Sequence, residues 1–415
     1  LRAADVVLVT NMGVGLDSPF LERLERWLYA HHPKYWIDVV EPKKTDILYR
    51  NLDEDKRILL ESYRRTSGVM NYVRLINGAF STKPTSEWEE PDPIPWQAIM
   101  GREGNIYETY DEFMDAEGHR DWPSIAVYFY RDEWIMGDIE YQQALFEEIY
   151  KHQYNPIIFY GQYGSNPRVG IPNMKLSMNH LFGKDEFPFD VLINTCKFSF
   201  QSLGAQTLEE LKLQDVPIVQ GYTIYMDEKS WAENPQGVTP LDVNLSISQP
   251  ELDGVIQGGV VACQTYDERG HYVYLPVKER IAAIVQRAIK WSTLRHIPVS
   301  ERKVAVILHN YPPKNSNIGS AAGLDTPESV LRLLRDMKAE GYTIDRVPET
   351  SADLMDVVIS HMTNDRSMLT DELLASAEGR LSSDDYKAYF AKLPEDTQTA
   401  MVKSWGGARG CIRLR

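Results

Sequence analysis

The sequence lacks the hallmarks of several large classes of protein. Its 415 residues include only 3 Cys, at the distant positions 196, 263 and 411, so a disulfide scaffold is excluded and we expect a reducing, cytoplasmic location. No apolar run approaches the roughly 20 residues of a membrane-spanning helix. The sequence also has no GxxxxGK[ST] phosphate loop, no HExxH, no CxxC pair and no EF-hand loop. It therefore carries none of the common short motifs for a nucleoside triphosphate or a metal ion.

Positive charge is also scarce. The chain has 44 Lys and Arg against 60 Asp and Glu, which gives a formal net charge of −16. A nucleic-acid binder needs a basic surface to displace counterions, so we do not expect nucleic acid as a partner. Hydrophobic residues make up 43% and aromatic residues 11% of the chain. This composition excludes disorder for most of the chain and predicts packed domains.

Short β-branched runs alternate with helical patterns along the sequence, which predicts parallel βαβ units. We expect an α/β fold made of several Rossmann-like or flavodoxin-like, partial doubly wound parallel sheets in tandem. The expected domains are an amino-terminal α/β domain (1–120), a central α/β domain (121–300) and the start of a third (301–415). The expected strands cover residues 5–10, 36–40, 125–130, 156–160, 190–194, 216–220, 304–308 and 357–360. One expected helix starts at residue 19, and the others cover residues 52–78, 138–152, 278–291 and 326–340. A polar helical tail is expected after them.

A glycine pattern after the first expected strand faintly resembles a dinucleotide-binding turn. Gly13 and Gly15 are followed by Asp38 after the second strand, but Ser18 stands where the third glycine belongs. A partial pattern of this kind is weak support for a cofactor. We favour an ordinary strand-to-helix turn.

The most informative stretch is HNYPPKNSNIGSAAGLD, residues 309–325. It lies between an apolar run and a helix that starts with Thr326 as the expected cap and Pro327 in its first turn. Strand-to-helix loops are usually about 2–6 residues long, so this loop is unusually long. Its prolines are stiff, its asparagines offer neutral donors and acceptors, and its Gly and Ala residues let a flat ligand approach the backbone. The loop is either a ligand-binding loop or an Ω-like loop packed on itself.

This stretch and its continuation, VILHNYPPKNSNIGSAAGLDTPESVLRLLRDMKAEGY, resemble the signature of the CobN-type cobalt chelatase large subunit, which is shared with the magnesium chelatase H subunit. Weaker matches follow the family's order: DVLINTCKFSF, DVPIVQGYTIYMDEKSW, PELDG and LPEDTQTAMVKSWG. The last is more similar to the cobalt branch. The resemblance covers most of residues 120–406. Because family members are much longer, we expect the chain to be the amino-terminal portion of such a subunit.

The resemblance implies a ligase-type enzyme that forms nitrogen–metal bonds. Its large subunit binds a metal-free corrinoid or porphyrin ring while a divalent metal is inserted, and separate AAA+ subunits hydrolyse ATP. We expect Co²⁺ as the substrate metal and hydrogenobyrinic acid a,c-diamide, an intermediate of cobalamin biosynthesis, as the ring. The alternative is Mg²⁺ with protoporphyrin IX. We expect this portion of the subunit to be inactive alone.

Candidate site residues follow from the same resemblance. His309 can accept pyrrolic protons or ligate the metal transiently, although a packed or loop-bonding histidine is the favoured alternative. Glu251, with Asp253, can form a carboxylate pair near the pocket, or Glu251 simply caps the turn before Gly254. The candidate ring-binding residues are Asn310, Tyr311, Pro312, Pro313, Asn315, Asn317, Ile318 and Gly319.

Two other functional classes stay open. The chain can be a different α/β enzyme, such as a dehydrogenase, or a periplasmic-type binding module, with the long loop as a sugar or nucleotide site. It can also be a non-catalytic scaffold or ligand-binding fragment that folds and docks partners but inserts no metal. NAD(H) titration separates the first class from a chelatase subunit.

Overall fold

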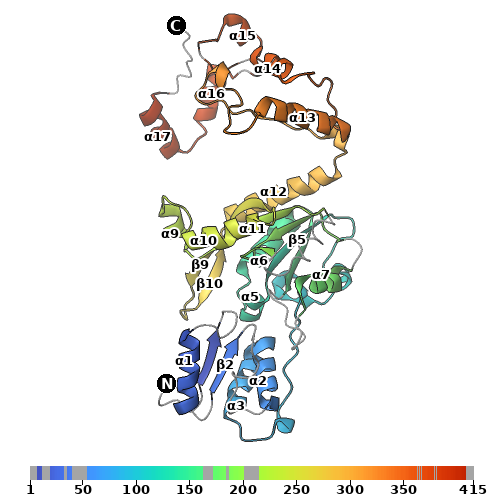
Figure 1. Ribbon diagram of the computed structural model, residues 1–415, viewed down its shortest axis with the longest axis vertical. Helices are drawn as coiled ribbons and strands as arrows, with labels where there is room; N and C mark the ends of the chain where they lie inside the picture. The colour runs from blue at the N-terminus through green and yellow to red at the C-terminus, as the bar shows by residue number, and fades with distance from the viewer. Residues whose placement is uncertain are drawn as a thin grey trace. The chain divides into compact units, whose positions relative to one another are not determined.

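A computed structural model of the chain describes residues 7–11, 19–31, 35–39, 54–161, 172–183, 187–200, 215–361, 363, 365, 367–377, 379 and 381–407 (Figure 1). The chain forms two compact units, Leu1–His296 and Ile297–Arg415. The first contains a large, mostly parallel sheet with helices, so the expected α/β class is confirmed. The predicted boundary at residue 120 stays a prediction, as does the one at residue 300.

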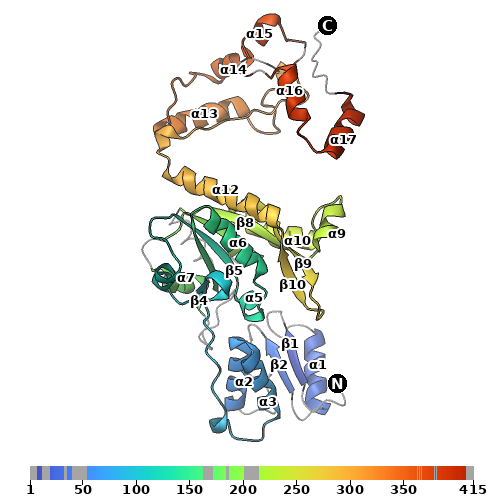
Figure 2. The ribbon, with the colours of Figure 1, turned by 180° about the vertical axis from the view of Figure 1, so that it is seen from behind.

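The amino-terminal elements follow the expected strand–helix–strand order. Strand β1 (Val7–Asn11) pairs in parallel with β2 (Tyr35–Val39), and α1 (Pro19–His31) connects them. Helices α2 (Glu54–Thr66) and α3 (Val69–Phe80) lie on the opposite side of this small sheet from α1 (Figures 1 and 2). The expected single helical region 52–78 is thus two helices. Gly13, Gly15 and Ser18 lie outside the described residues, as does the side chain of Asp38.

The break between α2 and α3 has a clear backbone cause. Ser67 and Gly68 both have positive φ, at 67° and 86°, a conformation that no helix continues through. The sequence offers only Gly68 as a signal for it.

The main sheet has eight strands in the order β10-β9-β8-β7-β5-β6-β3-β4. Strands β6, β5, β7, β8 and β9 run parallel, and β3, β4 and β10 pair antiparallel at the two edges. The bounds are Ala98–Met100 (β3), Ile106–Tyr107 (β4), Ser124–Tyr130 (β5), Asn155–Gly161 (β6), Val191–Asn194 (β7), Ile218–Ile224 (β8), Ile256–Tyr266 (β9) and Tyr272–Pro276 (β10). The four strands expected in this region are confirmed.

The core lies on these central strands. The apolar side chains of β5, β6 and β7 are buried on both faces, as expected for parallel strands covered by helices. Helices α6 (Glu140–Lys151) and α12 (Lys278–His296) contact each other and pack against the sheet (Figure 2). From β5 the chain builds β6 on one side and then returns to build β7 on the other. The carboxyl ends of β5, β6 and β7 therefore meet at the edge where α/β sheets usually place ligands.

The first unit also contains shorter helices. Their bounds are Tyr110–Ala116 (α4), Arg131–Met136 (α5), Met174–Phe182 (α7), Glu228–Glu233 (α9), Pro240–Asp242 (α10) and Gln249–Glu251 (α11).

The described residues of the second unit form helices and no strand. The bounds are Thr326–Ala339 (α13), Ser351–Ile359 (α14), Asp371–Ala375 (α15), Ser383–Phe390 (α16) and Glu395–Trp405 (α17). The polar helical tail is confirmed. The cap of α13 is Asp325, whose side chain accepts from Glu328 N at 3.0 Å, so the expected cap one residue later, at Thr326, is corrected.

Two expected strands of this unit are wrong. Residues 304–308 have no partner strand in the described part of the chain, and Ile307 is 91% exposed. β-Branched residues favour a strand only where a sheet buries them, and no sheet does so here. Residues 357–360 fall at the end of α14, where the side chains of Thr350 and Asp353 form a capping box that starts a helix.

Candidate functional site

The loop of residues 309–325 closes on itself. Gly319 N donates to His309 O at 2.8 Å, and Asn310 and Ile318 form an isolated antiparallel bridge. A 3₁₀ turn, Asn315–Asn317, lies between these two ends. The loop is therefore a compact structure with its own hydrogen bonds, as the Ω-like alternative predicts.

Two of the predicted amide side chains hold this loop together. The Asn310 Oδ1 atom accepts from Lys314 N at 3.2 Å. Asn317 Nδ2 donates to Pro312 O at 2.8 Å. These amides thus fix the shape of the loop, and their contact with a ring stays a prediction.

Asn315 anchors the loop to a segment about fifty residues later in the sequence. Its N–H donates to Asp365 Oδ2 at 3.2 Å, and its Oδ1 accepts from the Thr363 hydroxyl. Hydrogen bonds from Ser367 and from Asn315 N, with the nearby Lys314 charge, hold the pKa of Asp365 below its usual value. The carboxylate therefore stays charged and keeps this anchor at neutral pH.

The predicted wall of the site faces solvent. Tyr311 is 73% exposed, Pro312 and Pro313 are exposed, and the Tyr311–Pro312 peptide bond is cis. The His309 ring is exposed and lies 6.3 Å from the Tyr311 ring, centroid to centroid. The imidazole is thus not packed, and within the described residues His309 bonds in the loop only through its backbone oxygen. A role of the ring in proton transfer or metal binding stays a prediction.

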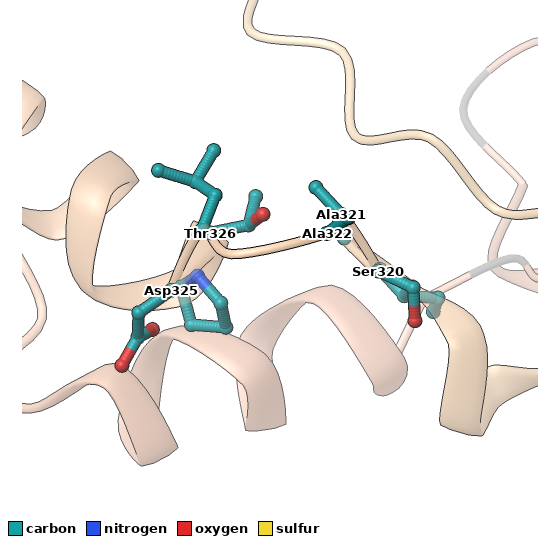
Figure 3. A pocket seen from close by; sticks show the side chains of 9 residues that line it. Ser320, Ala321, Ala322, Asp325 and Thr326 are labelled. Atoms are coloured by element: carbon teal, nitrogen blue, oxygen red, sulfur yellow. The ribbon is translucent and has the colours of Figure 1, made fainter.

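A cavity of about 530 Å³ lies where the loop meets the start of α13. Figure 3 shows Ser320, Ala321 and Ala322 along the loop, with Asp325 and Thr326 at the first turn of the helix. The lining residues are Ile318, Gly319, Ser320, Ala321, Ala322, Leu324, Asp325, Thr326 and Pro327. Small side chains leave the backbone open on one side, and polar groups stand on the other.

Two polar groups of this cavity stand out. The Thr326 Oγ1 atom is buried and has no hydrogen-bond partner. The Asp325 carboxylate accepts one backbone hydrogen bond through Oδ1. The carboxylate can only accept hydrogen bonds, whereas the hydroxyl can accept or donate, so the Asp325 end of the cavity suits a ligand that presents N–H donors.

Gly319 fits this place for a conformational reason. Its φ is +73°, and a Cβ added to it would lie 3.2 Å from Thr326 Cγ2. A larger residue would therefore be strained and would push on the helix start.

The acidic candidates lie in the other unit. Glu251 is exposed at the end of α11, and its carbonyl accepts from Gly254 N at 3.0 Å, as the turn-cap alternative predicts. Asp253 is buried and accepts from Ser199 Oγ at 2.6 Å and from Phe200 N. Asp253 therefore holds the segment after β7. A catalytic role for Glu251 stays a prediction.

No ready metal centre is found in the described part of the chain. It contains no group of three or more His, Cys, Asp or Glu residues placed to hold a metal ion. Cys196 and Cys263 are free and buried, and burial raises the pKa of both thiols; Cys411 is outside the described residues. None of the helices in the described regions is long and apolar enough to cross a membrane.

The comparison with known families decides the relationship. A sequence model of the CobN/Magnesium Chelatase family matches residues 61–414. The chain belongs to this family. The match includes the whole loop, the cavity at the start of α13 and the main sheet.

Relatives with curated sequences agree with the family assignment. An uncharacterized protein of Methanocaldococcus jannaschii is 31% identical over 382 residues, which is 88% of this chain and 31% of that protein. The aerobic cobaltochelatase subunit CobN of Pseudomonas aeruginosa is 27% identical over 77% of this chain and 25% of its own length. The magnesium-chelatase H subunit of Rhodobacter capsulatus is 30% identical over 37% of this chain and 14% of its own length. The chain thus spans about a third or less of these family members.

A solved structure shares the fold. The catalytic subunit of cobaltochelatase from Mycobacterium tuberculosis matches with a TM-score of 0.59 and 22% identity, over 98% of this chain and 33% of that chain.

The residues that line the cavity in the structure differ from the ring-binding residues that the sequence predicted. Of the predicted ring-binding residues, only Ile318 and Gly319 line the cavity. Of the polar lining residues Asp325 and Thr326, only Thr326 stood out in the sequence, and only as the start of the helix. Their order, an Asp directly before the Thr-Pro that opens a helix, is the sequence signal that could have placed them at the cavity.

Proposed function

We propose that this protein is the ring-binding portion of an ATP-dependent metal chelatase that inserts Co²⁺ into hydrogenobyrinic acid a,c-diamide. The observation that carries the proposal is the family loop, which closes on itself and leaves a cavity at the start of α13. Small residues form one side of that cavity, so a flat macrocycle can approach the backbone closely. On the other side stand the Asp325 carboxylate and the Thr326 hydroxyl.

The polar groups of the cavity favour an amide-bearing ring. Asp325 and the unpartnered Thr326 Oγ1 accept hydrogen bonds. The two amides of the diamide ring supply N–H donors for these groups, whereas the polar rim groups of protoporphyrin, its carboxylates, supply none. The extent of the sequence matches points the same way, because the cobalt relative aligns with 77% of this chain and the magnesium relative with 37%. Mg²⁺ insertion into protoporphyrin IX is the second candidate.

Metal insertion needs a proton acceptor, a transient metal ligand and a surface that holds the ring. His309 can serve as either of the first two, since its imidazole is exposed and an imidazole nitrogen can accept a proton or ligate a divalent metal. Tyr311, Pro312 and Pro313 form a stiff, exposed surface beside it. We assign ring contact to these residues and leave ATP hydrolysis to partner AAA+ subunits.

Ring binding tests the proposal directly. The protein is titrated with a metal-free corrinoid diamide and with a metal-free porphyrin, and ring absorbance and quenching of Tyr and Trp emission are followed. We expect the corrinoid to bind more tightly. Failure of both rings to bind at micromolar concentration refutes the proposal. Tighter binding of the porphyrin refutes the cobalt assignment and favours Mg²⁺ insertion into protoporphyrin IX.

Variants locate the site. Asn317→Ala removes the bond to Pro312 O and should weaken ring binding by about 1 kcal/mol through loss of loop shape. Asn310→Ala should act in the same direction. Asn244→Ala, an exposed position in the other unit, is the matched control and should leave affinity unchanged. Equal affinity in all three variants would place the ring elsewhere.

A further inference from the structure

A second, larger cavity lies within the first unit. Its volume is about 790 Å³, and its walls come from α2, the segment 91–97, β4, the residue after β4, and α7. The lining residues are Ser62, Thr66, Pro91, Asp92, Pro93, Ile94, Pro95, Trp96, Gln97, Ile106, Glu108 and His180. It takes no part in the loop site of the second unit.

The topology places this cavity at the edge of the main sheet where ligands usually bind. Strand β6 ends at Gly161, and the antiparallel β3 pairs its first residue, Ala98, with Tyr160. Trp96 and Gln97, which precede β3, therefore belong to the carboxyl edge of the parallel strands. Ligands of α/β sheets bind outside these carboxyl ends.

Arg131 forms the support behind the cavity wall. It follows β5 directly and is 1% exposed. Its Nε donates to Pro95 O at 2.8 Å, and its Nη2 donates to Thr66 O at 2.8 Å and to Ile94 O at 3.1 Å. Its guanidinium carbon lies 4.5 Å from the centre of the Trp96 ring. All four of these partner residues line the cavity.

The charge of this arginine is not balanced by an ion pair within the described residues. Its Nη1 atom is buried without a hydrogen-bond partner, and in the described part of the chain Arg131 forms no ion pair. Burial lowers its pKa to about 10, so it stays charged at neutral pH. The nearby Tyr160 hydroxyl is likewise buried without a partner, and burial raises its pKa. A buried cation without an anion is costly, and sites of this kind are often completed by a ligand.

We propose that this cavity binds a planar ligand bearing a single carboxylate, with Arg131 as the positive charge and Trp96 as the stacking surface. The rim favours one negative charge over two, because it carries the exposed Glu108 and also Asp92, which is paired with Arg74 at 2.6 Å. Because Nη1 is buried, the proposal requires the segment of Ile94 and Pro95, whose carbonyls accept from the same guanidinium, to open locally when the ligand binds. The proposal stands apart from the ring site, which belongs to the other unit.

Calorimetric titration with 2-naphthoate, and with neutral 2-naphthamide as the matched ligand, tests the charge. We expect the carboxylate to bind about tenfold more tightly than the amide, as for a gained charge-assisted hydrogen bond. Amide hydrogen exchange should change at Ile94, Trp96 and Gln97 when 2-naphthoate binds. Equal affinity of the two probes, or no binding of 2-naphthoate at millimolar concentration, overturns the proposal.

Variants that keep the fold test the residues. Trp96→Leu should weaken 2-naphthoate binding several-fold by loss of stacking, and Glu108→Gln should strengthen it two- to threefold by removing a like charge at the exposed rim. Arg131→Lys keeps the charge but loses the planar fork and should weaken binding. Arg102→Gln, at an exposed arginine paired with Glu147, is the control and should change nothing. Unchanged affinity in both Trp96→Leu and Glu108→Gln overturns the assignment of this cavity.

Discussion

Replacing Thr326 by Val separates the stability of the second unit from its ligand binding. Thr326 is the first residue of α13, and its Oγ1 is buried without a hydrogen-bond partner. Val keeps the branched shape and replaces only the hydroxyl by a methyl group. The two residues have similar helix propensities, so the change isolates the polar group.

The expected effects have opposite signs. A buried hydroxyl without a partner costs about 1–3 kcal/mol, so Thr326→Val should stabilise α13 by about 1 kcal/mol. If a ring amide completes this hydrogen bond, the same variant should bind the corrinoid about fivefold more weakly, which corresponds to about 1 kcal/mol. If the variant is more stable but binds the ring more weakly, the Thr326 hydroxyl forms its hydrogen bond with the ligand and not with the protein.

The assay is native-state hydrogen exchange across residues 326–343, combined with ring titration. Thr343→Val is the matched control, because Thr343 Oγ1 donates to Ser300 O at 2.7 Å. Loss of that bond should destabilise by about 1 kcal/mol and leave ring affinity unchanged. The reasoning is refuted if Thr326→Val destabilises as much as Thr343→Val.

Three further changes test the structure. Burial raises the pKa of Glu133 to about 8, above its usual value of 4.5. Between these two pH values the folded protein keeps a proton that the unfolded chain loses, so the free energy of unfolding falls as pH rises from about 4.5 to 8. Glu133→Gln should reduce this fall, as measured by urea unfolding at a series of pH values. Asp253→Ala removes the acceptor of two donors and should destabilise the first unit by about 2–4 kcal/mol in the same assay, whereas the exposed Glu251→Ala should change little. Gly319→Ala, at φ +73° and crowding the first residue of α13, should cost about 1–2 kcal/mol, seen as faster exchange of the loop amides.

Most of the first unit could be predicted from its sequence because its strands find their partners within the chain. Ile157 and Ile158 in β6 sit beside Ala126 and Val127 in β5, and all four are buried. Val304 and Ile307 belong to the same kind of apolar run, but they are exposed because nothing in the described chain pairs with them. A run of β-branched residues indicates that a segment would be stable in a buried strand, but whether it is buried depends on the presence of a partner strand in the fold.

The site was harder to predict than the fold. The unusual loop stood out by its length and composition, but side-chain direction depends on contacts that spacing does not reveal. Asn317 turns inwards to Pro312, and Asn315 is held by Asp365, which is distant in sequence. Arg131 gave no signal in the sequence, because a single arginine after a strand is common. Its buried Nη1 and the absence of an ion pair within the described residues are visible only in three dimensions.

The exposed stretch of residues 304–308 has a consequence for the behaviour of the protein in solution. Val304, Val306 and Ile307 present apolar side chains to water and have no neighbouring strand in the described part of the chain. Exposed apolar side chains that lie together along the chain favour association with another molecule. At high concentration, this short stretch would therefore determine solubility, and the most useful position for a solubilising lysine is the 91% exposed Ile307.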